Sequence, residues 1–267
     1  MKLNKQLRKQ VNVADQKECN MKTIVLGDIH GLDVWKKIVK HENADRVIFI
    51  GDYFDSFNIP HSDQINNFLD IIEYKKSSGK KVIMLIGNHD YHYMKDIDEN
   101  YSGFKAQYKP AISILLEENK EHLQMAYQTD DFLFTHAGVS SDFMDRAFTN
   151  GWRVENIADN LNELFKYKPL SFSFGKFRNP EFNIDPYGDN KEQSPIWIRP
   201  KSLMQSNRDT LRKEVIQVVG HTVIKEMDIK GKATGNRYFF IDCLEMSGEY
   251  LIIENGIVTS NSHRNYE

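Results

Sequence analysis

Cysteine and long apolar runs are scarce in this sequence. Its 267 residues contain 2 cysteines, Cys19 and Cys243, which are too few for a disulfide framework. The longest apolar runs, such as residues 82–86, fall far short of the ~20 residues needed to span a bilayer. No early segment has the apolar core of a signal peptide. These absences predict a cytoplasmic protein that spans no membrane and has no disulfide scaffold.

Charge of one sign is not in excess either. The 35 basic and 38 acidic residues give a formal net charge of −3 and are spread through the chain. A protein that binds nucleic acid usually carries a basic patch or stripe, so no nucleic-acid partner is expected. The chain does have 40% hydrophobic and 12% aromatic residues, which is enough for a sizeable folded core.

Short apolar runs alternate with amphipathic segments in the first part of the chain. Strands are expected at 21–26, 46–50 and 81–86, with helices at 32–41 and 63–76 between them. This alternation predicts a largely parallel sheet with functional residues at the carboxyl ends of its strands. Further elements are predicted in the rest of the chain: helices at 111–119 and 154–166, strands at 132–135, 196–199, 214–219, 238–241 and 250–253, the C-terminal strands being antiparallel.

Three stretches lie outside this pattern. Residues 1–20 are polar and aperiodic and are interpreted as a solvated extension, with the domain at 21–260 and a polar tail at 261–267. Residues 168–195 are rich in Pro, Gly, Asn, Phe and Tyr, which predicts a long irregular insertion. Its aromatic and basic residues belong either to a packed segment or to a lid that stacks a nucleotide base.

Five motifs follow apolar runs in order along the chain, and each contains glycine and metal-type donors. They are Gly27-Asp28-Ile29-His30-Gly31, Gly51-Asp52-Tyr53-Phe54-Asp55, Gly87-Asn88-His89-Asp90, Thr135-His136-Ala137-Gly138 and Gly220-His221-Thr222. Glycine permits sharp turns and close approach of the backbone. Carboxylate, amide and imidazole ligands suit borderline divalent ions such as Mn, Fe, Zn or Ni. Two ions roughly 4 Å apart need a carboxylate that touches both, and Asp52 is the candidate bridge.

This ordered series spans residues 27–222 and resembles the calcineurin-like metallophosphoesterases, particularly their phosphoprotein phosphatase branch. The resemblance implies a four-layer α/β/β/α domain with two divalent or trivalent metal ions, Mn first among them, at the top of the β sandwich. It implies a bridging hydroxide as the nucleophile. The implied ligands are Asp28, His30 and Asp52 on one metal, and Asp52, Asn88, His136 and His221 on the other.

The same resemblance implies how the leaving group and the phosphate are handled. His89 is the general acid that protonates the leaving alkoxide, and Asp55 orients it, since a carboxylate raises the imidazolium pKa and fixes its geometry. Asn88 also contacts the phosphate. The segment Trp197-Ile198-Arg199-Pro200 is similar to the tryptophan and arginine segment of bacterial members, so Arg199 is predicted to grip the phosphate.

The chain departs from the family pattern at several positions. Ser56-Phe57 stands where the phosphoprotein phosphatases have Arg-Gly, so one expected arginine is missing there. Asp90 replaces a glutamate and Ala137 a glycine, and both changes are expected to bear on substrate choice more than on hydrolysis. Candidates for the second arginine are Arg153, Arg178 and Arg208. The remaining histidines are interpreted as surface or core residues: His41, His61, His92, His122 and His263. Tyr91 and Tyr93 either form a packed aromatic pair, which their spacing favours, or line the pocket.

The sequence therefore predicts hydrolysis of a phosphomonoester, with a phosphorylated serine or threonine protein as the leading substrate. Bis-nucleoside tetraphosphates or other nucleotides are the alternative, because related bacterial enzymes divide between those uses. A phosphodiesterase on the same site is a further alternative. A metal-binding scaffold without catalysis, which docks a partner protein, is the alternative from another class.

Overall fold

The computed structural model describes residues 21–175, 190–206, 211, 214–230, 235 and 237–266. The predicted extension 1–20, the candidates Arg178 and Arg208, and residues 176–189 of the predicted insertion lie outside the described residues. Among the helices of the described ranges, none has the length and apolarity required to cross a membrane.

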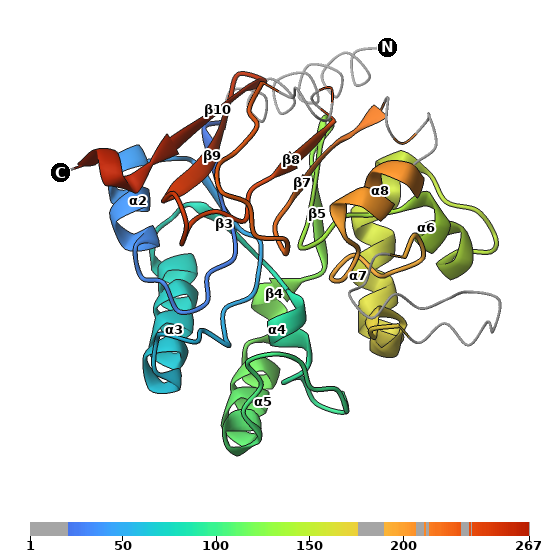
Figure 1. The fold of residues 1–267 in the computed structure, drawn as a ribbon, viewed down its shortest axis with the longest axis horizontal. Helices are drawn as coiled ribbons and strands as arrows, with labels where there is room; N and C mark the ends of the chain where they lie inside the picture. Colours follow the sequence, from blue (N-terminus) through green and yellow to red (C-terminus); the bar gives the residue numbers. More distant parts are fainter. Residues whose placement is uncertain are drawn as a thin grey trace, which may run out of the picture.

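Strands and helices alternate along most of the chain (Figure 1). The strands and α-helices are β1 (Thr23–Leu26), α2 (Trp35–Glu42), β2 (Arg46–Phe49), α3 (His61–Ser77), β3 (Lys81–Leu85), α4 (Asn88–Tyr91), α5 (Lys109–Glu118), β4 (Leu123–Gln124), β5 (Ala126–Gln128), β6 (Phe132–Thr135), α6 (Ser141–Ala147), α7 (Ile157–Tyr167), α8 (Pro200–Ser206), β7 (Ile216–Val219), β8 (Tyr238–Phe240), β9 (Glu249–Glu254) and β10 (Ile257–Ser262). Short 3₁₀ helices are η1 (Ala106–Tyr108), η2 (Lys120–His122), η3 (Val154–Asn156), η4 (Pro169–Phe172) and η5 (His263–Tyr266).

The strands form two mixed sheets. The six-stranded sheet has the order β10-β9-β1-β2-β3-β4, and the four-stranded sheet has the order β5-β6-β7-β8. Strands β1 to β4 are parallel, and so are β6 to β8. Strand β9 is antiparallel to both β1 and β10, and β5 is antiparallel to β6. Each sheet therefore has several parallel strands whose carboxyl ends lie at one edge.

The two sheets pack face to face and carry helices on their outer faces. Val25, Ile48 and Leu85 of the first sheet share one buried cluster with Phe134 and Val218 of the second. The outer face of the first sheet packs against α2, α3 and α5, and that of the second packs against α6 and α7. Figure 1 shows α2 and α3 on one side of the strands and α6, α7 and α8 on the other. The predicted four-layer α/β/β/α architecture is confirmed.

Two predictions about the later part of the chain are wrong. Residues 196–199 form a turn that leads into α8, because the amides of Trp197 and Ile198 both donate to the Ser194 carbonyl. The apolar residues of this turn are buried in the core, and such a short apolar run cannot be distinguished from a strand by its pattern. In addition, β8 pairs in parallel with β7, so only β9 and β10 of the C-terminal strands are antiparallel.

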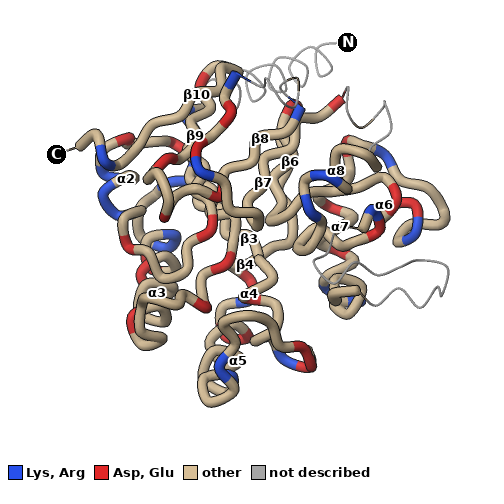
Figure 2. Tube along the Cα trace, viewed as in Figure 1, with Lys and Arg blue, Asp and Glu red and all other residues tan. Residues whose placement is uncertain are grey.

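Charged residues of both signs lie along the same outer elements. Figure 2 shows Lys and Arg interspersed with Asp and Glu on α2 and α3. The exposed pair Lys36 and Asp70 joins these two helices at 2.6 Å. Mixed charge of this kind favours solubility over recognition of a polyanion.

Candidate active site

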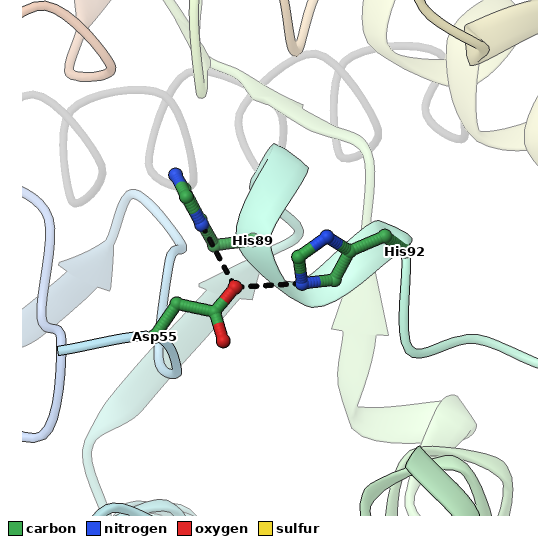
Figure 3. Close-up of side chains that lie close together, drawn as sticks. All are labelled: Asp55, His89 and His92. Atoms are coloured by element: carbon green, nitrogen blue, oxygen red, sulfur yellow. Dashed lines mark hydrogen bonds and ion pairs between the residues drawn. The ribbon is translucent and has the colours of Figure 1, made fainter. Parts of the chain in front are cut away.

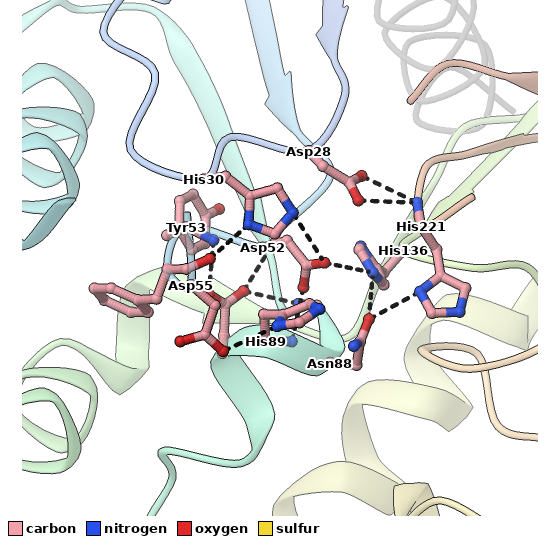
Figure 4. A network of polar contacts seen from close by, with 12 residues as sticks. Asp28, His30, Asp52, Tyr53, Asp55, Asn88, His89, His136 and His221 are labelled. Atoms are coloured by element: carbon pink, nitrogen blue, oxygen red, sulfur yellow. Dashed lines mark hydrogen bonds and ion pairs between the residues drawn. The ribbon is translucent and has the colours of Figure 1, made fainter. Parts of the chain in front are cut away.

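The five glycine-containing motifs meet at the carboxyl edge of the two sheets (Figure 4). Three of them follow β1, β2 and β3, and the other two follow β6 and β7. Because these strands are parallel within their sheets, their ends bring the polar side chains of all five motifs together. The side chains that the motifs contribute are Asp28, His30, Asp52, Asp55, Asn88, His89, His136 and His221.

Several of these residues have an unusual backbone conformation. The φ angles of His30, Asp52, Asp55 and His221 are 40°, 53°, 67° and 67°. Left-handed conformations cost non-glycine residues about 1–3 kcal/mol each and persist where the surrounding structure fixes them. Their concentration in one cluster indicates that side-chain placement at this edge outweighs backbone strain.

Two glycines let carboxylates pack against the backbone. A Cβ atom at Gly87 would lie 2.0 Å from Asp52 Oδ1, and one at Gly220 would lie 2.2 Å from Asp28 Oδ1. No side chain fits in either place, so these positions require glycine for close approach.

Asp52 lies at the middle of the cluster and is 1% exposed. Its Oδ1 accepts the His89 amide at 2.8 Å, while Oδ2 faces His136 Nε2 at 3.3 Å and His30 Nε2 at 3.8 Å. Burial raises the pKa of Asp52, but the charges of His136 and His89 outweigh burial and hold that pKa well below its usual value. Asp52 is therefore an ionised acceptor shared between imidazoles.

Asn88 and Asp28 complete the group. Asn88 Oδ1 lies 3.0 Å from His136 Nε2 and 2.8 Å from His221 Nδ1. The Asp28 carboxylate accepts the His221 amide at 3.0 and 3.2 Å. Ligand atoms of Asp28, Asp52 and His136 lie within 4.8 Å of one another, a spacing that can hold a metal ion.

Three imidazoles use one ring nitrogen on a backbone carbonyl. His30 Nδ1 donates to the Phe54 carbonyl at 2.6 Å, His136 Nδ1 to that of Ile50 at 3.1 Å, and His221 Nε2 to that of Trp197 at 3.2 Å. Since a carbonyl only accepts, each of these nitrogens carries the hydrogen. In a neutral ring the other nitrogen keeps its lone pair, which is how metal-binding histidines are oriented.

Burial favours the neutral form of two of these rings, those of His30 and His221. It lowers the pKa of His30, and it lowers the pKa of His221 strongly, helped there by the charges of His136 and Arg199. The His30 Nε2 lone pair then faces Asp52 Oδ2 at 3.8 Å, and the His221 Nδ1 lone pair faces Asn88 Oδ1 at 2.8 Å, so acceptors point at acceptors. A cation relieves such an arrangement, and this set of carboxylate, amide and imidazole donors fits borderline divalent ions.

His89 and Asp55 lie together as a pair. His89 Nδ1 donates to Asp55 Oδ2 at 2.9 Å, and the His89 side chain is 18% exposed whereas that of Asp55 is fully buried. Burial lowers the pKa of His89, but the charges of Asp52 and Asp55 outweigh burial and raise it. The pair can therefore hold a proton at the partly open side of the cluster.

Two residues expected to be structural also contact Asp55. Tyr93 OH donates to Asp55 Oδ1 at 2.6 Å, and His92 Nε2 lies 2.7 Å from Asp55 Oδ2 (Figure 3). Both residues are fully buried, as expected of core residues. No motif predicts their contact with Asp55. The one sequence signal is their spacing, because residues three and four positions after His89 lie on the same side of a helical turn as His89.

Asp90 lies behind the cluster. It is 1% exposed, and its carboxylate accepts the backbone amides of Asp52 at 2.8 Å, Tyr53 at 2.7 Å and Gly87 at 2.9 Å. Ala137 is also buried. Asp90 therefore joins the loops that carry Asp52 and Asn88, and the bearing of these two departures on substrate choice stays a prediction.

Asp242 is a site residue that the motifs do not mark. It lies two positions after the end of β8, is 9% exposed, and interacts with Asp28. Burial and the nearby Asp52 charge raise the pKa of Asp242 to about 6. Because β8 is parallel to β7, its carboxyl end reaches the same edge as the other motifs. If this strand were antiparallel, as predicted from the sequence, Asp242 would lie at the opposite edge of the sheet.

Arg199 lies beside the loop that carries His221. Its Nη1 donates to the His221 carbonyl at 3.2 Å and to Thr222 Oγ1 at 3.0 Å. At the position of the missing arginine, Ser56 Oγ instead accepts the amides of Asn58 and Ile59 at 3.2 and 3.1 Å. Arg153 forms an ion pair with the exposed Glu155. A phosphate contact of Arg199 stays a prediction.

The sequence model of the calcineurin-like phosphoesterases matches residues 21–225, which is most of the chain. The protein therefore belongs to this family, whose members are phosphoric ester hydrolases. A sequence search among curated proteins gave no match.

Solved structures of phosphatases share the fold. One is a cold-active protein tyrosine phosphatase of the psychrophile Shewanella sp., with a TM-score of 0.57 and 19% identity over 91% of this chain and 78% of that chain. Another is a protein serine/threonine phosphatase from Saccharomyces cerevisiae, with a TM-score of 0.54 and 13% identity over 91% of this chain and 80% of that chain. At these identities the likeness concerns the fold alone.

Proposed function

We propose that this protein hydrolyses phosphomonoesters at a two-metal centre. The ligands are Asp28, His30 and Asp52 for one ion, and Asp52, Asn88, His136 and His221 for the other. The observation that carries the proposal is the orientation of His221. Its Nε2 donates to the Trp197 carbonyl, which leaves the Nδ1 lone pair of the neutral ring facing Asn88 Oδ1 at 2.8 Å.

The chain's own residues divide the remaining tasks. When bound, two divalent ions activate water and neutralise charge on the phosphoryl oxygens. His89, protonated and hydrogen-bonded to Asp55, donates its proton to the leaving oxygen. Asn88 and Arg199 orient the phosphate. Arg199 suits this task because its guanidinium is anchored on the loop that carries His221.

A phosphorylated protein is the leading substrate. The family branch that the motifs resemble acts on phosphoserine and phosphothreonine, and the fold neighbours include phosphatases named for tyrosine and for serine/threonine. Bis-nucleoside tetraphosphates and other nucleotides are the second candidate. Mn as the metal and a cytoplasmic location stay predictions from the sequence.

Hydrolysis of p-nitrophenyl phosphate and of its bis ester, with added Mn²⁺, tests the proposal. We expect the monoester to be preferred, and the activity to be lost in Asp52→Asn and His89→Asn. Matched controls are Asp70→Asn, at an exposed ion pair, and His122→Asn, beside the exposed Glu121. Both controls should retain the activity of the unaltered protein.

Other outcomes distinguish the alternatives. A preference for the bis ester would indicate a phosphodiesterase. Bound metal without turnover of either ester would support the scaffold without catalysis and refute the proposal. If the monoester is preferred, a panel of phosphoserine, phosphothreonine and phosphotyrosine peptides beside bis-nucleoside tetraphosphates assigns the substrate class.

A further inference from the structure

The Asp55 carboxylate is enclosed by donors on both oxygens. Oδ2 contacts His89 Nδ1 at 2.9 Å and His92 Nε2 at 2.7 Å, and Oδ1 accepts the Tyr93 hydroxyl at 2.6 Å. Figure 3 shows the rings of His89, on α4, and of His92, just after α4, approaching the same Asp55 oxygen. Asp55 therefore has more partners than it needs to orient His89 alone.

Aromatic rings hold His92 in place. Its imidazole is stacked on Tyr101 at 5.2 Å between centroids and meets the rings of Tyr93 and Phe104 edge-on at 4.4 and 4.9 Å. His92 is 0% exposed. Burial lowers the pKa of His92, although Asp55 opposes this shift.

The segment 101–105 closes the other side of Asp55. A Cβ atom at Gly103 would lie 2.8 Å from Asp55 Cβ, so the backbone packs directly on this side chain. The Tyr93 hydroxyl also accepts the Lys105 amide at 3.0 Å, which fixes the hydroxyl between the loop and the carboxylate. Asp55 consequently has little freedom to rotate.

The contact distances favour protons over a metal ion in this group. His89, His92 and Asp55 offer ligand atoms close enough to be considered for metal binding. A nitrogen and an oxygen ligand, each about 2.0 Å from a tetrahedral zinc ion, would be ~3.3 Å apart. The His89–Asp55 hydrogen bond of 2.9 Å and the polar contact of 2.7 Å between His92 Nε2 and Asp55 Oδ2 are both shorter than this separation.

We propose that His92 and Tyr93 are positioning residues for proton donation by His89, acting through Asp55. This inference rests on the proposed function. A general acid contributes about 10²–10⁴-fold to a rate only while its proton points at the leaving oxygen. Asp55 sets the direction of the His89 ring, and His92 and Tyr93 set the direction of Asp55. The segment 88–93 thus carries a metal ligand, the acid and the residues that orient the acid's partner.

Tyr93→Phe and its matched control Tyr91→Phe test the inference. Each substitution removes one buried hydroxyl from the same segment, but the Tyr91 hydroxyl contacts the Pro169 carbonyl and Ser173 and does not touch Asp55. We would measure kcat and KM of the Mn-loaded proteins on p-nitrophenyl phosphate and phenyl phosphate, together with metal content. Phenol is the weaker acid, so its release depends more on a donated proton.

We expect Tyr93→Phe to lower kcat about 10-fold more on phenyl phosphate than on p-nitrophenyl phosphate, with KM and metal content unchanged. Tyr91→Phe should keep the unaltered ratio of the two rates. His92→Leu should change the ratio as Tyr93→Phe does, and His92→Gln, which keeps a donor, should partly restore it. If His92→Leu does not fold, Tyr93→Phe decides.

Equal losses on both esters in Tyr93→Phe would overturn the inference and leave the proposed function intact. The same shift in Tyr91→Phe would also overturn it, because a general packing defect would then explain the result. If the unaltered protein hydrolyses neither ester, the proposed function fails and this inference fails with it.

Discussion

Replacing Asp90 by asparagine should loosen the two loops that carry Asp52 and Asn88. The change conserves shape and replaces a carboxyl group whose pKa is raised well above its usual value by burial and by the Asp52 charge. In the structure Asp90 Oδ2 accepts the amides of Asp52 and Gly87, and Oδ1 accepts that of Tyr53. An asparagine whose oxygen keeps the first two contacts turns its NH₂ group toward the Tyr53 amide, so a donor faces a donor.

The size of the effect follows from these contacts. A buried backbone donor without a partner costs about 1–3 kcal/mol. A loss of about 2 kcal/mol corresponds to a fall in Tm of about 4–8 °C for a domain of this size. Disturbing groups behind metal ligands typically weakens metal binding about 10–100-fold.

Thermal unfolding and titration with Mn²⁺ would measure both effects. The same substitution at the exposed Asp70, which pairs with Lys36, is the matched control and should change stability by less than about 1 kcal/mol. An Asp90→Asn protein with an unaltered Tm and unaltered Mn²⁺ affinity would refute the view that Asp90 holds these loops.

Three further outcomes are expected. Hydrogen bonds from Lys22 and Tyr250 outweigh burial and lower the pKa of Glu42 to about 2, so its stabilising effect is full above about pH 4.5 and is lost as pH falls toward 2. In urea unfolding at pH 7, Glu42→Gln should be about 2 kcal/mol less stable than the unaltered protein, and this difference should narrow below pH 4.5. A difference that does not depend on pH would contradict this explanation. Gly220→Ala places a Cβ 2.2 Å from Asp28 Oδ1 and should abolish tight metal binding in calorimetry. Gly79→Ala, with φ of +68° and nothing within 4 Å of the added Cβ, should lower stability through backbone strain but leave metal binding unchanged. Burial raises the pKa of the Cys243 thiol to about 12, so in a Cys19→Ser background folded protein should resist iodoacetamide at pH 8 and react only after unfolding.

The residues of the five motifs are predictable because local sequence determines them. An apolar run ends, a glycine turns the backbone, and a polar donor follows, which is a pattern confined to a few adjacent positions. Because the strands are parallel, their carboxyl ends then lie at one edge of the sheet, and this brings the motifs together. Helices α2 and α3 are predictable for the same reason, since their buried faces repeat at helical spacing, as with Trp35 and Ile38.

The direction of a strand is not predictable in this way, because it is determined by neighbouring strands that are distant in the sequence. Nothing within 238–241 indicates that β8 pairs in parallel with β7, and Asp242 escapes prediction for that reason. The residues that contact Asp55 are also distant from it in the sequence. His92 and Tyr93 look like core residues, and only the fold shows that their polar atoms meet a carboxylate 37 and 38 positions earlier in the chain.

The turn at 194–199 links the wrong strand prediction to the site itself. Its Trp197 carbonyl accepts His221 Nε2 and thereby sets which His221 nitrogen faces Asn88, while Arg199 donates to the backbone of the same histidine. An extended strand would align these groups with a neighbouring strand instead. The turn is therefore favoured by the contacts that orient His221 more than by its own apolar sequence, and such conflicts between local pattern and fold are expected near functional sites. If this reasoning holds, changes in the turn should alter metal affinity through His221 even where they leave every predicted ligand in place.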